Sequence, residues 1–143
     1  APQAVLHIGV APRAALPRLE LRAYNRAAVL PDAAGNPPPA RRLEEGGPSI
    51  RRACAPSLRE VGGTPLRLSL DPGAYLCNAL LYRSLASRRP WRPVAFLHVP
   101  LPHPRRGAQP ADLLTLARAV IDGLRSSALP ARPRRQSKPS RAR

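Results

Sequence analysis

Three side chains of the sequence, Cys77, His98 and Glu20, have the types that nucleophilic acyl transfer requires. A cysteine attacks a carbonyl as its thiolate, a histidine takes the thiol proton, and a carboxylate orients and stabilises the imidazolium that forms. Cys77 stands early in a predicted helix, where the positive end of the helix dipole favours a thiolate. Taken singly, each of the three is more commonly a structural residue. Spacing alone does not bring them together.

The elements that must position these residues alternate along the chain, which is typical of an α/β layer fold. The nearly all-apolar runs at 4–10 and 93–99 are typical of strands buried on both faces of a parallel sheet. Functional groups in such sheets gather beyond the carboxyl ends of the strands, so one shared site is compatible with this layout. We also expect strands at 18–25 and 64–70, helices at 51–60, from Asp71-Pro72 onward and at 110–126, and a long loop at 30–48.

Length and composition exclude several classes of protein. The 143 residues fit one domain, and no run of about 18 apolar residues is long enough to span a membrane. The start of the sequence has no basic segment of the secretory type, so we expect a cytoplasmic protein. Two cysteines and three scattered histidines give neither a disulfide framework nor zinc-ligand spacing. We therefore expect no metal and no cofactor.

The net charge of +16 is the feature that favours nucleic acid as a partner. All but one of the 24 basic residues are arginine, which also fits a composition bias spread over the whole chain. Residues 129–143 add six basic residues and no acid, with no aromatic side chain among them to stack on bases. We expect residues 1–128 to form a single domain, incomplete at its N-terminus, and residues 129–143 to be a disordered Arg-rich tail.

Five blocks of sequence resemble the pyroglutamyl peptidase I (pyrrolidone-carboxylate peptidase) family. The family's nucleophile motif, approximately Ala-Gly-x-Tyr-x-Cys-Asn, is similar to DPGAYLCNALLY at 71–82, and its Phe-x-His-x-Pro motif to AFLHVP at 95–100. Upstream, LHIGVA at 6–11 and LELRAYN at 19–25 resemble two of its strands, and PDAAGN at 31–36 resembles its Pro-Asp-x-x-Gly loop. The blocks occur in the family's order.

This resemblance implies a three-layer α/β/α fold of the phosphorylase/hydrolase-like type with a mostly parallel sheet. It also implies a cysteine peptidase whose triad is Cys77, His98 and Glu20. Cys77 would attack the amide carbonyl after an N-terminal pyroglutamyl residue, His98 would act as base and then acid, and Glu20 would hold His98. Backbone N–H groups at the start of the Cys77 helix would stabilise the oxyanion. The implied partners are peptides with an N-terminal pyroglutamate. Whether the chain also forms a homo-oligomer is left undecided by the sequence.

The chain departs from the family at its beginning. A Gly-Phe-x-Pro-Phe-Gly loop, whose phenylalanines pack on the pyroglutamyl ring in the family, is not found, and the only phenylalanine is Phe96. Two other hypotheses therefore stand beside the peptidase. One is a truncated, catalytically silent relative, and the other is a basic nucleic-acid-binding protein, whose affinity would fall steeply with salt.

Overall fold

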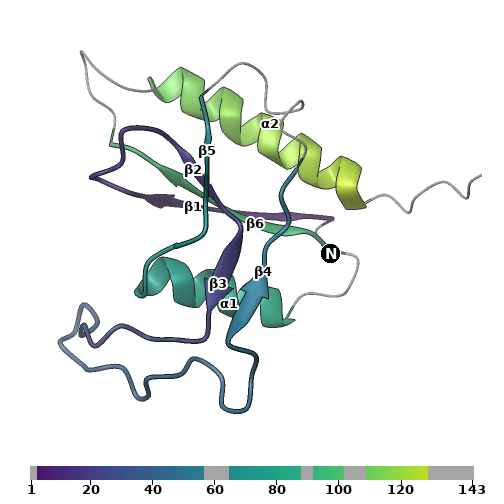
Figure 1. Cartoon of the computed structure of the whole chain (residues 1–143). Helices are drawn as coiled ribbons and strands as arrows, with labels where there is room; N and C mark the ends of the chain where they lie inside the picture. Colours follow the sequence, from purple (N-terminus) through teal and green to yellow (C-terminus); the bar gives the residue numbers. More distant parts are fainter. Residues whose placement is uncertain (1–2, 57–64, 88–91, 102–108, 129–143) are drawn as a thin grey trace, which may run out of the picture.

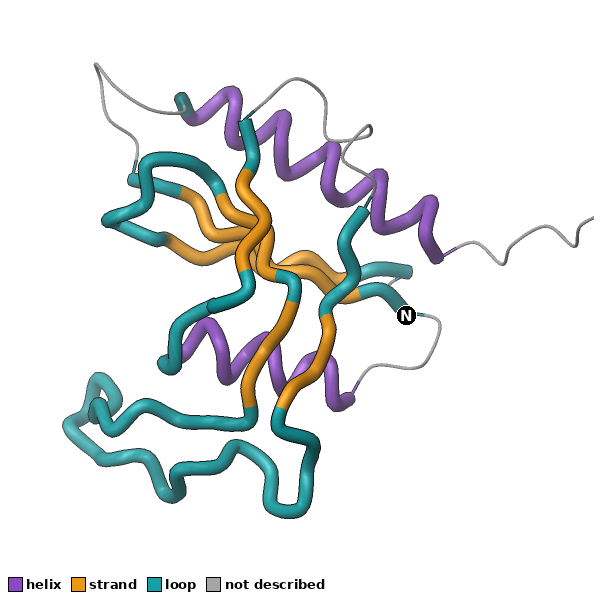
Figure 2. The backbone as a smooth tube through the Cα atoms, in the orientation of Figure 1, coloured by secondary structure: helices purple, strands orange, loops and turns teal. Residues whose placement is uncertain are grey.

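A central sheet lies between two helices in the computed structural model, which describes residues 3–56, 65–87, 92–101 and 109–128 (Figures 1 and 2). Helix α1 covers one face of this sheet and helix α2 the other. The elements are β1 (Val5–Val10), β2 (Arg18–Glu20), β3 (Arg22–Tyr24), β4 (Ile50–Arg52), β5 (Arg67–Ser69), α1 (Leu76–Ser87), β6 (Val94–Val99) and α2 (Pro110–Ala128). The expected three-layer α/β/α architecture is confirmed.

The main sheet has the strand order β1-β6-β2-β5. The pairs β1–β6 and β2–β5 are parallel, and the central pair β2–β6 is antiparallel. The sheet is thus mixed, with two of its three pairings parallel. Within the described residues β1 is an edge strand, and its Ile8 and Val10 are more than half exposed.

The predicted strand at 18–25 is two strands in two sheets. β2 belongs to the main sheet, whereas β3 pairs antiparallel with β4. Leu21 makes the transition, because its N–H donates to the carbonyl of Ser69 while its carbonyl accepts from Ala53. The alternating pattern predicts an extended chain but does not reveal that the chain changes partners in the middle.

Two of the expected helix starts are wrong. Residues 50–52 form β4, so no helix begins at Ser49, and the rest of that expected helix, from residue 57, lies outside the described residues. Helix α1 begins at Leu76 rather than at Asp71-Pro72. Gly73 adopts a left-handed backbone with φ of 84°, and its N–H donates to the Asp71 carboxylate at 3.1 Å. This turn precedes the helix and delays its start.

Two apolar clusters hold the layers together, one on each face of the sheet. The cluster under α2 is formed by Leu19, Ala95, Leu97, Leu116, Ala117, Val120 and Leu124. The cluster under α1 is formed by Ala23, Leu81, Tyr82, Leu85, Val94 and Phe96. Each fully buried Leu or Phe stabilises the fold by about 1.5–3 kcal/mol relative to an exposed one. The amphipathic pattern predicted at 110–126 is confirmed by α2.

The expected tail at 129–143 lies outside the described residues. Within the residues that are described, no helix is long and apolar enough to cross a membrane. In the same part of the chain, no group of three or more His, Cys, Asp or Glu side chains is arranged to hold a metal ion.

Candidate active site

The alternation of β6 places His98 on the α1 face of the sheet. Phe96, two residues earlier on that strand, packs into the cluster under α1, while Leu97 packs into the cluster under α2. Because side chains two apart on a strand share a face, His98 lies on the α1 side with Phe96. The two rings are adjacent, with centroids 4.8 Å apart. His98 is only 5% exposed.

Glu20 reaches His98 diagonally across the antiparallel β2–β6 pair. Glu20 is paired with Phe96 in the register, and its Oε1 lies 2.7 Å from His98 Nδ1. A carboxylate only accepts hydrogen bonds, so Nδ1–H donates and the unprotonated Nε2 of a neutral imidazole is left as an acceptor. This is the tautomer that a general base requires.

The second oxygen of Glu20 indicates that the Glu20–His98 pair costs free energy of folding. Glu20 is fully buried, and its Oε2 has no hydrogen-bond partner among the described residues. A buried, incompletely satisfied carboxylate disfavours folding relative to an apolar side chain. Glu20 therefore makes its contact with His98 at a cost in stability.

Cys77 occupies the same face of the sheet, above β1. A Cβ added to Gly9 would lie 3.2 Å from the Cys77 Sγ and 2.8 Å from the Phe96 ring. Gly9 is also the β1 partner of His98 in the parallel β1–β6 register. The absence of a side chain at Gly9 therefore makes room for the sulfur and for the Phe96 ring beside the strand that carries His98. The structure thus brings all three predicted residues to one face and one end of the sheet.

The surroundings of Cys77 favour the thiol over the thiolate. Burial raises the pKa of the Cys77 thiol, and the negative charge of Glu20 raises this pKa further, whereas the residue's own backbone N–H lowers it. The expectation that the start of the helix by itself favours a thiolate is therefore not met. A thiol in these surroundings would need a base to remove its proton when the sulfur attacks, and His98 lies on the same face of the sheet.

Asn78 fixes the start of α1, a role that no pattern in the sequence indicates beyond its place beside Cys77. Its buried side-chain oxygen accepts from the backbone N–H of Tyr24 at 2.8 Å, and its amide nitrogen donates to the carbonyls of Tyr24 and Arg26. All of the bonding capacity of the side chain except one lone pair is directed at the end of β3. The residue next to the nucleophile is thereby held on a rigid element.

His7 is a second positioning residue that the spacing did not single out. Its Nε2 lies 2.8 Å from the Ser84 Oγ on α1, and its ring lies 6.0 Å from that of Phe96. Burial lowers the pKa of His7, which favours its neutral imidazole. His7 thus connects the middle of β1 to Ser84 of α1, seven residues beyond Cys77.

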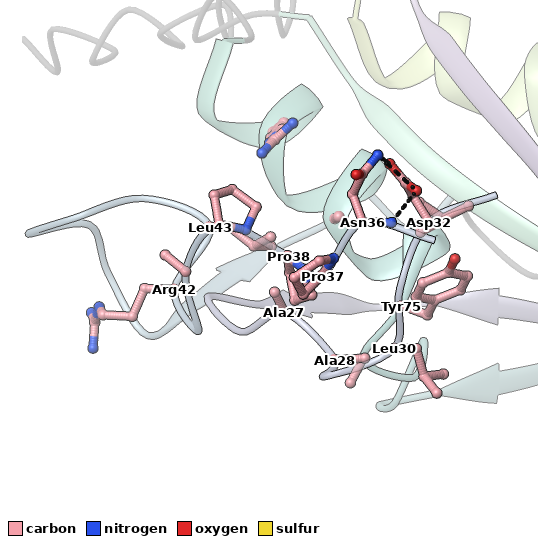
Figure 3. A pocket seen from close by; sticks show the side chains of 16 residues that line it. Ala27, Ala28, Leu30, Asp32, Asn36, Pro37, Pro38, Arg42, Leu43 and Tyr75 are labelled. Atoms are coloured by element: carbon pink, nitrogen blue, oxygen red, sulfur yellow. Dashed lines mark hydrogen bonds between the residues drawn. The ribbon is translucent and has the colours of Figure 1, made fainter. Parts of the chain in front are cut away.

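The loop at 27–43 forms a pocket of about 210 Å³ on the outer side of α1 (Figure 3). Leu76, Ala79 and Arg83 of α1 line it, whereas Cys77 and Ser84 face the sheet. The pocket is therefore not the space above Cys77 and His98. The Tyr75 hydroxyl donates to the Pro31 carbonyl at 2.8 Å, so the loop anchors the segment that leads into the Cys77 helix.

Comparisons with known proteins agree with this fold. No family model matches the sequence, and no curated protein matches it significantly. Solved structures do match it. The pyrrolidone carboxyl peptidase from Thermus thermophilus has 31% sequence identity and a TM-score of 0.76, over 86% of this chain and 70% of that one.

Two further structures have the same fold at lower identity. The pyroglutamyl peptidase I from Bacillus amyloliquefaciens is 21% identical with a TM-score of 0.76, over 87% of this chain and 66% of its own. A mutant pyrrolidone carboxyl peptidase from the hyperthermophile Pyrococcus furiosus is 20% identical with a TM-score of 0.75, over 90% and 71%. The chain thus spans about two thirds or slightly more of the length of these relatives. Together with the five blocks of sequence and their positions in the fold, the similarity to the Thermus enzyme shows that the chain belongs to the pyrrolidone carboxyl peptidase, or pyroglutamyl peptidase I, family.

Proposed function

We propose that this protein is a cysteine peptidase that removes an N-terminal pyroglutamyl residue from peptides. The observation that carries the proposal is the buried Glu20–His98 pair, 2.7 Å apart, on the sheet face where the Cys77 sulfur lies. Membership of the family supports the choice of substrate. The proposal needs no metal or organic cofactor, because these three side chains supply the nucleophile, the base and the acid.

The first step of the proposed reaction is acyl transfer to the sulfur. His98 Nε2 takes the Cys77 proton as the sulfur attacks the carbonyl carbon of the pyroglutamyl residue. Glu20 stabilises the imidazolium that forms, which is a task for a carboxylate held at Nδ1. The imidazolium then gives its proton to the amide nitrogen, the C–N bond breaks, and the peptide leaves with a free amino group. A thioester between Cys77 and the pyroglutamyl group remains.

The second step is hydrolysis of that thioester. His98 takes a proton from water as the water oxygen attacks the carbonyl carbon, and the sulfur leaves and recovers a proton. Free pyroglutamate is released and the starting state is restored. In both steps negative charge develops on the carbonyl oxygen. The backbone N–H groups of the first turn of α1 have no acceptors within the helix, which makes them candidate donors to this oxygen.

A chromogenic pyroglutamyl amide, such as the p-nitroanilide, tests the proposal directly. The 143-residue protein is expected to release p-nitroaniline, and Cys77→Ala is expected to lower kcat/KM by at least about 10³-fold because the nucleophile is lost. Cys54→Ala is the matched control, since Cys54 packs against the cluster under α2 on the opposite face of the sheet. Activity that survives in Cys77→Ala would refute the assignment of the nucleophile.

A catalytically silent relative is the competing proposal. Among residues 1–143 the one phenylalanine, Phe96, is 1% exposed and packs against His7 and His98, so no phenylalanine of this stretch covers a pyroglutamyl ring. The same assay decides between the two. No turnover by the wild-type chain, in a sample shown to be folded by circular dichroism, would favour the silent relative.

A further inference from the structure

A row of functional side chains crosses the main sheet on its α1 face. Gly9, which makes room for the Cys77 sulfur, is paired with His98, His98 is paired with Arg18, and Arg18 is paired with Arg67. Directly paired residues point to the same face of a sheet. The order across β1, β6, β2 and β5 is therefore nucleophile, base, first arginine and second arginine.

The two arginines of this row are an unusual pair. Like charges directly opposite each other on neighbouring strands destabilise a sheet. The Nε of Arg18 is buried and has no hydrogen-bond partner among the described residues. The acid on the same face of β2 is Glu20, whose Oε1 is bound to His98 and whose Oε2 makes no hydrogen bond to Arg18. A guanidinium that lacks an acceptor in the described part of the chain is expected where an anion from outside the chain binds its terminal N–H groups.

The proposed chemistry determines which part of a substrate would meet these arginines. His98 must give its proton to the departing amide nitrogen, so the leaving half of the peptide lies on the His98 side of the scissile carbonyl. In the row, the residue beyond His98 on that side is Arg18. Neighbouring strands are about 4.8 Å apart, and one extended residue spans about 3.5 Å. A carboxylate on the first residue after the scissile bond is therefore within reach of Arg18.

We propose that Arg18, supported by Arg67, forms a subsite for a carboxylate on the first residue of the leaving half of the substrate. This inference rests on the proposed function and adds a specificity to it. The carboxylate comes from one of two sources, the free C-terminus of a pyroglutamyl dipeptide or an acidic side chain in a longer peptide. Arg18 offers its two terminal nitrogens as a planar fork that matches either carboxylate.

Binding to an inert protein tests the subsite without relying on turnover. Isothermal titration calorimetry of the Cys77→Ala chain would use three peptides: pGlu-Ala with a free carboxylate, pGlu-Ala amide, and pGlu-Glu amide. The free acid is expected to bind about tenfold more tightly than the alanine amide, as one charge-assisted hydrogen bond would produce. The third peptide identifies the source, because it gains affinity only if a side-chain carboxylate also reaches Arg18.

Variants of the Cys77→Ala chain distinguish binding by Arg18 from a general effect of positive charge. Arg18→Gln is expected to remove the preference for the carboxylate and to leave the affinity for the alanine amide unchanged, and Arg67→Gln to reduce the preference partly. Arg118→Gln, on the exposed surface of α2, is the control for loss of one positive charge. If Arg18→Gln does not fold, Arg18→Lys keeps the charge without the fork and is expected to show a weakened preference.

The outcomes distinguish this inference from the function on which it rests. Equal affinity for the free acid and the alanine amide, or a preference that persists in Arg18→Gln, would overturn the subsite and leave the peptidase proposal intact. A loss of preference as large in Arg118→Gln as in Arg18→Gln would also overturn it. If neither alanine peptide binds to the folded protein, both proposals fail.

Discussion

The two faces of the main sheet have different compositions, although they are built from the same strands. On the face under α2, β6 contributes Ala95 and Leu97 to a cluster made only of apolar side chains. On the face under α1, the same strand contributes Phe96 and His98, and the described neighbours include the buried or partly buried polar side chains of Glu20 and Cys77. Alternation along the strands therefore places apolar side chains alone on one face. On the other face it places the candidate catalytic side chains beside further apolar ones.

This difference indicates that the α2 face contributes mainly to stability and the α1 face mainly to the candidate site. The α2 face buries a cluster of apolar side chains, so burial of that cluster favours folding. The α1 face includes a carboxylate with an unpartnered oxygen and a cysteine with a raised pKa, which are features that folding alone does not favour. We expect substitutions on the α1 face to affect activity more than stability and substitutions on the α2 face to do the reverse.

The largest expected effect is on activity, from Glu20→Gln on the α1 face. An amide keeps the shape of the side chain but cannot stabilise the imidazolium, so kcat is expected to fall by about 10²–10⁴-fold. The melting temperature is expected to stay the same or to rise, because a buried charge is removed. Glu44→Gln, which alters an acid paired with Arg51 away from the row, serves as the control for both the hydrolysis assay and thermal unfolding.

An unchanged kcat in Glu20→Gln would show that the Glu20–His98 contact has no part in the reaction. A large fall in melting temperature would contradict the division between the faces, because it would mean that the charged pair stabilises the fold.

The next effect is on stability, from Leu116→Ala on α2. Leu116 is fully buried in the cluster under α2, and its truncation is expected to lower the free energy of unfolding by about 2–5 kcal/mol. Leu114→Ala is the matched control on the same helix, because Leu114 is 53% exposed. Urea denaturation measures the difference, and kcat per folded molecule is expected to be unchanged. A loss of kcat in Leu116→Ala at full occupancy of the folded state would show that the two faces are coupled.

The smallest effect is a dependence of stability on pH that His7 causes. Burial lowers the pKa of folded His7 below 6.5, so the unfolded chain binds a proton more readily than the folded one. The contribution of His7 to the free energy of unfolding is therefore greatest above pH 6.5. It is lost as the pH falls from 6.5 through the lower pKa of His7 in the folded state. His7→Gln keeps a polar partner for Ser84 but removes this titration.

Melting temperatures of wild type and His7→Gln between pH 5 and pH 8 measure this contribution. The wild type is expected to lose more stability than the variant toward acid pH, by a small margin because the half-exposed ring is screened by water. A steeper acid loss in the variant would reverse the sign and contradict the lowered pKa.

Much of the architecture could be predicted from local pattern. The apolar runs became β1 and β6, and the stripe at 110–126 became α2, because burial on both faces or on one face leaves a periodic trace in the sequence. The helix expected near Ser49 failed because pairing of β4 with β3 outweighed a weak helical pattern broken by Pro56. Helix α1 begins later than the Asp71-Pro72 pattern predicts, because Gly73 forms a turn before the helix.

Residue type and local order are enough to predict the α/β class, the resemblance to the family, and the cysteine, histidine and glutamate as candidates for chemistry. The fold was needed to establish that Glu20 contacts His98 across 78 positions of chain, that Gly9 makes room for the Cys77 sulfur, and that Arg18 is paired with His98. These juxtapositions depend on strand order and register. Both are set by the packing of the whole sheet between its helices, which no local segment of sequence specifies.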